Sequence, residues 1–325
     1  MSSIDILPSD DQLEIVEGIA RALASQGLGK TDISTIAELG YLGAGLSEAD
    51  GGFGLSVADE ALIHIKLGRH VADIRILATM LAARLAAANG ETALCKALII
   101  GREKIGFAVP VQGWPRSSTG PSGDAYFVGD GDLYLALSPH GGCLVPASDV
   151  ATHEQVESMD ASASASRATI TAVKPWSVGG KEGIWQVAML FAAAQLTGTG
   201  QAALHMGAEY AKTREQFDKP IGTFQGIAHP LADCALRSEA ATNQVYYAAI
   251  ALRDGFPDAT QQVTAALLVG IDAGLRNATT NIQTHGAMGY SAETGAHLYL
   301  KRAVVLRQIV GGIRMHERAM LADTG

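Results

Sequence analysis

The sequence predicts an α+β fold that is mainly α, with helices at both ends of the chain and a small β-domain between them. Apolar residues recur at helical spacing in both outer regions, whereas the middle region has short apolar runs bounded by Gly, Pro, Ser and Asp. The 325 residues are 48% hydrophobic and 18% charged, which is enough to bury a core in two or three domains. We therefore expect an N-terminal α-helical domain over 1–100, an abbreviated β-domain over 101–176 and a C-terminal four-helix domain over 177–325.

The first region is expected to form helices over 12–24, 56–67, 73–88 and 91–99. In the first of these, Val16, Ile19 and Leu23 share one helical face, and Asp10 precedes it as a candidate N-cap. The glycine-rich segment 45–56 separates the first two helices and is expected to be a loop.

The middle region is expected to form strands over 105–111, 125–128, 133–137, 142–145 and 168–173. Its end, 160–166, is of low complexity. Three acidic residues at Glu154, Glu157 and Asp160 are expected to lie in an exposed loop.

The last region returns to long apolar-periodic segments with few prolines, and these predict helices over 184–213, 224–253, 257–283 and 296–310. Gly311 and Gly312 then interrupt the pattern, as expected where a helix ends.

The composition excludes several functional classes. A net charge of −9 without clustered Lys and Arg argues against nucleic-acid binding. The acidic N-terminus lacks the features of a secretory signal, and apolar runs such as 185–196 are too short to span a bilayer. Three scattered cysteines imply neither disulfides nor a metal site. We expect a cytoplasmic protein that does not associate with membranes.

Two segments carry the most specific pattern, T-R-E-Q-F-D-K-P-I-G-T-F-Q over 213–225 and Q-T-H-G-A-M-G-Y over 283–290. In this order and spacing they resemble signatures of the acyl-CoA dehydrogenase family, flavoproteins that desaturate CoA thioesters. G-G-F-G-L-S over 51–56 resembles a third family segment. The domain order also matches, so the resemblance covers the whole chain and implies an acyl-CoA dehydrogenase-like fold.

The resemblance implies that the first motif binds FAD across a subunit interface. Arg214 would contact the pyrophosphate, because a guanidinium donates paired hydrogen bonds to phosphate oxygens. Phe217 would pack by the adenine and Gln225 would add a polar contact. The alternative is that Arg214 pairs with a neighbouring carboxylate such as Glu215.

The second motif implies further FAD contacts from Gln283, Gly286, Ala287 and Gly289. Small residues at a helix end let backbone N–H groups approach phosphate. Ala287 stands where the family has a second glycine and admits this approach less freely. The alternative is an ordinary turn between helices.

No catalytic residue is predicted in this chain. The family reaction needs a carboxylate, usually a Glu with a raised pKa, to remove the α-proton while the β-hydrogen leaves as hydride to the flavin. Alignment places Ala188 and Val310 at the two positions where such a base occurs, and neither accepts a proton. The nearby Glu182 and Glu317 are more simply surface charges.

The β-domain also departs from the family pattern, since 110–124 lacks the flavin-facing residues. Trp114 within this stretch could stand near a ligand or simply anchor a loop.

The chain keeps the cofactor motifs but lacks a base. In this it resembles the shortened, non-catalytic-type subunit of bacterial heterotetrameric (α2β2) steroid-type acyl-CoA dehydrogenases. This implies a homologous catalytic subunit as partner, a CoA thioester as substrate, fatty acid or steroid side-chain β-oxidation as context, and electron-transferring flavoprotein as acceptor. Two alternatives stay open. One is a self-sufficient homo-oligomer using an unexpected acid such as Glu182, and the other is a CoA-thioester-binding or assembly protein without flavin chemistry. A flavin monooxygenase on the same fold is disfavoured by the short β-domain.

Overall fold

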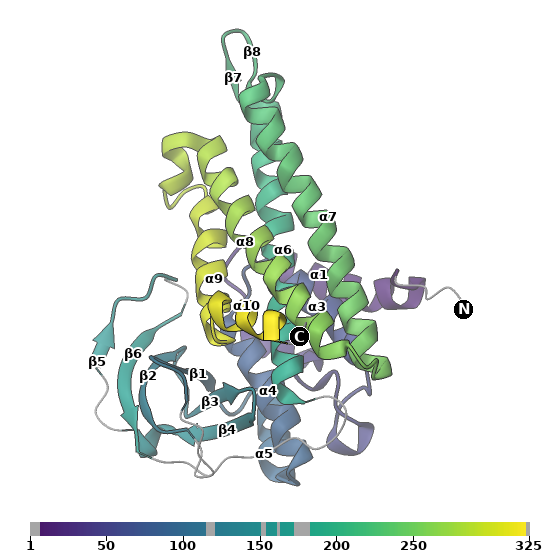
Figure 1. The fold of residues 1–325 in the computed structure, drawn as a ribbon, viewed down its shortest axis with the longest axis vertical. Helices are drawn as coiled ribbons and strands as arrows, with labels where there is room; N and C mark the ends of the chain where they lie inside the picture. Colours follow the sequence, from purple (N-terminus) through teal and green to yellow (C-terminus); the bar gives the residue numbers. More distant parts are fainter. Residues whose placement is uncertain (1–6, 115–120, 151–153, 161–162, 172–182, 323–325) are drawn as a thin grey trace.

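A computed structural model describes residues 7–114, 121–150, 154–160, 163–171 and 183–322. Figure 1 shows an elongated bundle of long helices that ends in a hairpin at one end, with a β-sheet and the shorter N-terminal helices gathered around the other end. The mainly α fold with a small sheet confirms the predicted fold class. The expected boundaries at residues 100 and 176 stay a prediction, and the second lies outside the described residues.

Apart from the short helix Ile33–Glu38, which was not predicted, the N-terminal helices follow the predicted apolar spacing, and all but the last have a side-chain cap at the start. Ser9, rather than Asp10, caps the first helix and forms a capping box with Gln12. Ser56 and Asp59 form the same motif at the start of the third. The glycine-rich segment is a loop apart from a short 3-10 turn, Glu48–Asp50. The helices are α1 (Asp10–Gln26), α2 (Ile33–Glu38), α3 (Val57–Arg69), α4 (Ile74–Ala88) and α5 (Thr92–Ile99).

The middle region forms a six-stranded sheet in the order β4-β3-β1-β2-β6-β5, in which β1 and β3 are parallel and the other neighbours antiparallel. Alternate residues face opposite sides, so Phe107 and Leu135 join the helical core while Ala108 and Ala136 pack on the other face. The strands are β1 (Ile105–Pro110), β2 (Gly123–Val128), β3 (Leu133–Ser138), β4 (Gly141–Pro146), β5 (Glu154–Val156) and β6 (Ala165–Ile170).

One expectation about the end of this region is wrong. Asp160 is not in an exposed loop, since it is fully buried and forms an ion pair with Arg302. Composition alone misses this, because the partner is distant in sequence. Strand β6 begins within the low-complexity stretch and pairs with β2 along its whole length.

The last region contains the long helices of the bundle, and α6 lies at its centre. By length and composition α6 could cross a membrane, although the apolar run 185–196 was judged too short to do so from the sequence. In the structure, 89% of the most apolar window of α6 is buried inside the protein. It is therefore the core helix of the bundle. The helices are α6 (Ile184–Thr213), α7 (Gln225–Asp254), α8 (Ala259–His285), α9 (Ala296–Ile309) and α10 (Ile313–Ala322).

Glycines let α6 approach α3 until their backbones touch. A Cβ at Gly198 would lie 1.9 Å from the carbonyl oxygen of Ile65, and one at Gly68 would lie 2.0 Å from that of Gln195. Both distances are far below van der Waals contact, so this crossing admits only glycine at the two positions.

A histidine is buried in the same interface. His64 is fully buried, stacks on Phe191 with ring centroids 4.1 Å apart and accepts a hydrogen bond at Nδ1 from Gln195 at 3.0 Å. Burial, with a smaller contribution from Arg84, lowers the pKa of His64 to about 3. The ring is therefore neutral in the folded protein at any pH near neutrality.

Acidification should destabilise the protein through His64. Because its folded pKa lies below the unfolded value of about 6.5, the unfolded state binds the extra proton between the two values. The stabilisation is complete above pH 6.5 and is lost as the pH falls toward 3, by about 2 kcal/mol at pH 5. Urea unfolding at pH 7 and pH 5 should therefore show a smaller difference in His64→Leu than in the wild type. Equal pH dependence in both proteins would contradict the buried neutral ring.

Candidate functional site

The first motif forms a hairpin that projects beyond the end of the bundle (Figure 1). Strands β7 (Glu215–Gln216) and β8 (Lys219–Pro220) pair across a two-residue turn, in which Phe217 and Asp218 have φ of 54° and 62°. Non-glycine residues adopt this conformation rarely. It turns the Phe217 ring outward, where 86% of the residue is exposed.

The charged and polar residues of this motif are also accessible. Arg214 caps the end of α6 and is exposed, and no ion pair between described residues involves its guanidinium, so the alternative pairing with Glu215 is absent there. Gln225 is the exposed first residue of α7. Lys219 Nζ lies 4.4 Å from the centre of the Phe224 ring. The hairpin thus presents a free cation, an amide and an aromatic ring to the outside.

The second motif lies at the end of α8 and continues into a 3-10 turn, Gly286–Tyr290. Gly286 has φ 61° and ψ −137°, a backbone conformation essentially limited to glycine, and open space where a Cβ would be. Gly289 packs against the Ile282 backbone. Ala287 has no positive φ, so the alanine in place of the family glycine causes no backbone strain.

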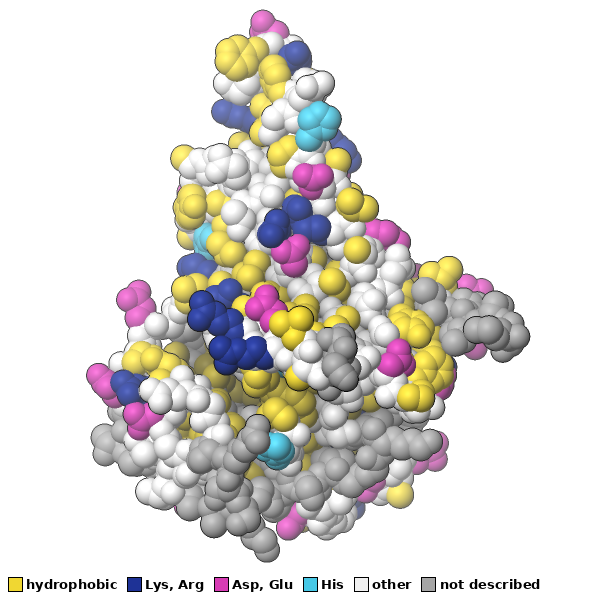
Figure 2. Space-filling model, viewed as in Figure 1, with side chains coloured by type: hydrophobic (Ala, Val, Ile, Leu, Met, Phe, Trp, Pro, Cys, Tyr) yellow, Lys and Arg dark blue, Asp and Glu magenta, His cyan; other side chains and the backbone are white. Residues whose placement is uncertain are grey.

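Both motifs lie at the same end of the bundle. Tyr210, one turn before Arg214, stacks on His285, immediately before Gly286, with ring centroids 4.1 Å apart. Gln283 is exposed on the last turn of α8, and Met288 and Tyr290 are exposed beside it. Apolar and basic side chains accordingly gather at this tip in Figure 2. Only Gly289 among the predicted cofactor residues is buried.

A cavity of about 830 Å³ lies at the opposite end of the bundle, between the sheet and the helices. One wall comes from β1, β3 and β4, and includes Val109 and Leu137. The other comes from Trp185 at the start of α6, Ile309 at the end of α9 and Met315 on α10. In Figure 2 an apolar hollow is visible here, below a group of Lys and Arg side chains.

The described lining of this cavity contains no carboxylate. Ala188 and Val310, at the two expected base positions, are 1% and 0% exposed and belong to the apolar core. Glu317 is exposed on α10, as expected of a surface charge. Glu182 lies outside the described residues.

Two titratable groups near the cavity, Cys143 and His316, do not supply a base, whereas the exposed His140 also lines it. Burial raises the pKa of Cys143 to about 12, which keeps its thiol protonated. His316 stacks on Trp185 and donates from Nε2 to the Val310 carbonyl at 2.6 Å. Burial, opposed by this hydrogen bond, lowers the pKa of His316, so the ring is neutral at pH 7.

The hairpin and the cavity are too far apart to form one site within a chain. The 29 residues of rise along α6 from Trp185 to Arg214 correspond to about 43 Å. No side chain of the hairpin can therefore reach the cavity of its own chain.

Comparison with known proteins identifies the family. Residues 187–324 match the model of the acyl-CoA dehydrogenase C-terminal domain. Acyl-CoA dehydrogenase IpdE2 of Mycobacterium tuberculosis is 31% identical over 261 residues, which cover 79% of this chain and 75% of that protein. The chain belongs to the acyl-CoA dehydrogenase family. Matches to two other curated members span only 40% and 29% of those proteins' lengths.

Two solved structures share the whole fold. The ChsE4–ChsE5 complex from Mycobacterium tuberculosis aligns with a TM-score of 0.81 at 21% identity, over 99% of both chains. The Tcur3481–Tcur3483 steroid ACAD, a G363A variant, aligns with a TM-score of 0.77 at 25% identity, over 95% of this chain and 96% of that one.

The cofactor of this family is FAD. The exposed groups at the tip fit such a molecule, because a free guanidinium suits a diphosphate and an outward-facing ring suits an aromatic base. Gly286 adds open backbone where a phosphate could approach. When bound, FAD would supply an acceptor for a hydride.

Sequence reasoning missed several residues near both ends. The Tyr210–His285 stack and the cavity wall at Trp185 gave no local signal. Trp114 proves to line the cavity and also packs on the sheet core, so it is both a loop anchor and a candidate ligand contact.

Proposed function

We propose that this chain is a subunit of an FAD-dependent acyl-CoA dehydrogenase whose catalytic carboxylate comes from a homologous partner chain. In an α2β2 assembly, Arg214, Phe217, Gln225, Gln283 and the Gly286–Ala287–Gly289 turn would bind FAD lodged mainly in the partner. The partner would supply the glutamate that removes the α-proton and most of the thioester pocket. Electrons would pass to electron-transferring flavoprotein in the cytoplasm.

The separation of the two sites is the observation that carries this proposal. An accessible cation and aromatic ring about 43 Å from the chain's own cavity can serve only a site outside that chain. The described lining of the cavity contains no carboxylate, and proton abstraction needs a base within hydrogen-bond reach. This supports the part of the proposal in which the partner supplies the base.

The comparisons support a heteromer acting on a bulky acyl group. The ChsE4–ChsE5 structure is a complex of two differently named chains, and the Tcur3481–Tcur3483 protein is described as a steroid ACAD. By analogy, we propose a CoA thioester with a steroid side chain as the substrate class.

Flavin content tests the assembly directly. The chain purified alone should be colourless, and co-expression with a homologous catalytic chain should give a yellow complex with about one flavin per pair of chains. A chain that is yellow and turns over a CoA thioester by itself would favour the homo-oligomer. A colourless complex with each candidate partner would favour the assembly protein.

Replacing Arg214 with Ala should strip flavin from the complex, because the diphosphate loses its paired donors. The measurement is flavin absorbance per mole of purified complex. Arg253→Ala is the matched control, since Arg253 lies at the opposite end of α7 and pairs with Asp254. Full flavin retention in Arg214→Ala would refute the assignment.

A further inference from the structure

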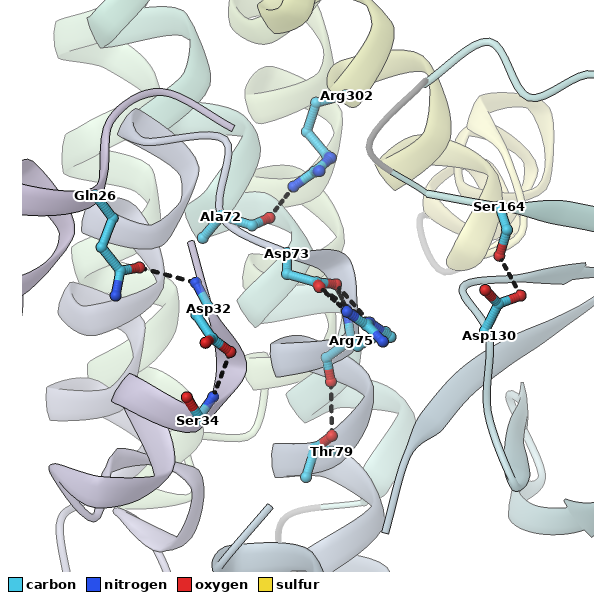
Figure 3. Close-up of polar contacts among 10 residues, drawn as sticks. All are labelled: Gln26, Asp32, Ser34, Ala72, Asp73, Arg75, Thr79, Asp130, Ser164 and Arg302. Atoms are coloured by element: carbon cyan, nitrogen blue, oxygen red, sulfur yellow. Dashed lines mark hydrogen bonds and ion pairs between the residues drawn. The ribbon is translucent and has the colours of Figure 1, made fainter. Parts of the chain in front are cut away.

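One buried side chain contacts all three parts of the fold. Arg302 of α9 is 1% exposed, and its Nε donates to Asp160 Oδ2 at 2.6 Å. Its Nη1 donates to the carbonyl oxygen of Ala72, a contact drawn in Figure 3. Asp160 belongs to the connection between β5 and β6, and Ala72 to the turn between α3 and α4. The guanidinium therefore joins the bundle, the β-domain and the N-terminal helices.

The turn that Arg302 contacts has a strained backbone. Val71 is β-branched, 1% exposed and has φ 50°, a conformation that such residues almost never adopt. Strained residues persist where the surrounding structure holds them, often beside functional sites. Donation by Arg302 to the next carbonyl is one of the contacts that hold this turn.

The β-domain meets the same turn through a second arginine. Asp73 caps α4 and receives a hydrogen bond from Arg75 Nε at 2.9 Å (Figure 3). The stem of Arg75 lies under Gly129, where an added Cβ would be 3.0 Å from its Cγ. The segment 71–75 therefore accepts a hydrogen bond from Arg302 of the bundle on one side. On the other side it packs against the turn that follows β2.

These contacts are connected along the chain to both walls of the cavity. From Arg302, α9 runs about 9 Å to Gln308 and Ile309, which line one wall. From Asp160, the chain turns through Ala163 into β6, which pairs with β2. Strand β2 pairs in turn with β1, whose end lines the opposite wall.

We propose that Arg302 is a positioning residue that sets the separation of the two cavity walls by holding the β-domain and the α3–α4 turn against α9. The planar guanidinium is needed for this, because its fixed fork donates in two directions at once whereas an ammonium is a single point charge. The proposal concerns the chain's own cavity and does not depend on how FAD is shared.

Fluorescence of Trp185 tests the proposal, because this residue lies on the cavity wall and is only 7% exposed. With Trp114 and Trp176 replaced by Phe, Trp185 is the sole tryptophan of the chain. In the full chain purified alone, Arg302→Met should raise the acrylamide quenching constant of Trp185 about two-fold, since the quencher reaches this nearly buried ring only when the packed walls part. Arg302→Lys should raise it as well, and Asp160→Asn provides a milder variant if Arg302→Met does not fold.

Arg84→Met is the matched control. It breaks another ion pair with a buried carboxylate, Glu60–Arg84, which joins α3 to α4 within the N-terminal helices. This variant should lower the melting temperature while leaving Trp185 quenching unchanged. A quenching constant in Arg302→Met no higher than in Arg84→Met would overturn the proposal, and so would complete restoration by Arg302→Lys.

Discussion

Replacing Gly198 with alanine should lower the free energy of unfolding strongly and move the urea unfolding midpoint well below that of the wild type. The added Cβ would lie 1.9 Å from the Ile65 carbonyl oxygen, and both atoms belong to helix backbones that cannot rotate away. One of the two core helices must then shift. Overpacking of this kind costs about 1–3 kcal/mol or more, a large part of the roughly 5–15 kcal/mol that stabilises a domain. The measurement is the urea unfolding midpoint by far-UV circular dichroism.

Gly226→Ala is the control for that experiment, because Gly226 also lies in a long helix but an added Cβ there would meet no atom within 4 Å. Its midpoint should stay unchanged or rise, since alanine is favoured over glycine in a helix by up to about 1 kcal/mol. A wild-type midpoint in Gly198→Ala would mean that α3 and α6 cross less closely than the structure has them.

The longer helices were predictable because each depends on local spacing, whereas the short α2 and α10 were not predicted. The apolar periodicity placed α6 over 184–213 and α4 close to its observed bounds. Strands β1 to β4 were also anticipated, since turn residues bound each of them. Strand β5, Glu154–Val156, was missed because three residues carry too short a pattern.

Contacts between distant segments were not predictable from this sequence. Asp160 has acidic neighbours and an alanine–serine tract after it, which indicate a solvated loop; only the folded chain brings Arg302 beside it. The cofactor motifs were identified by resemblance, but their exposure at the far end of α6 from the cavity required the structure. That distance is what makes the difference between a site within one chain and a site shared between two.

Introducing a carboxylate at Val310 should reveal whether the expected base position still has the dry surroundings that a base requires. Val310 is fully buried in the apolar core between Ile309 and Gly311, both of which line the cavity. A glutamate there would be buried among apolar side chains, and an uncompensated buried charge costs about 3–5 kcal/mol. Val310→Glu should therefore be strongly destabilised at pH 7.

The pH dependence of the stability of Val310→Glu distinguishes a buried charge from a glutamate that simply does not fit. Desolvation raises the folded pKa of such a glutamate above its unfolded value of about 4.3, so the folded state binds the extra proton between the two values. The loss of stability should then shrink as the pH falls toward 4.3 and be complete above the folded pKa. Gln308→Glu, on an exposed residue of the same helix, should show little of this dependence. If Val310→Glu loses the same stability at pH 5 and pH 8, the carboxylate is solvated through the cavity, and a missing glutamate alone would then not explain a silent site. A loss that grows with pH would mean that the expected base position keeps the dry surroundings that raise a base's pKa, although the base itself is absent.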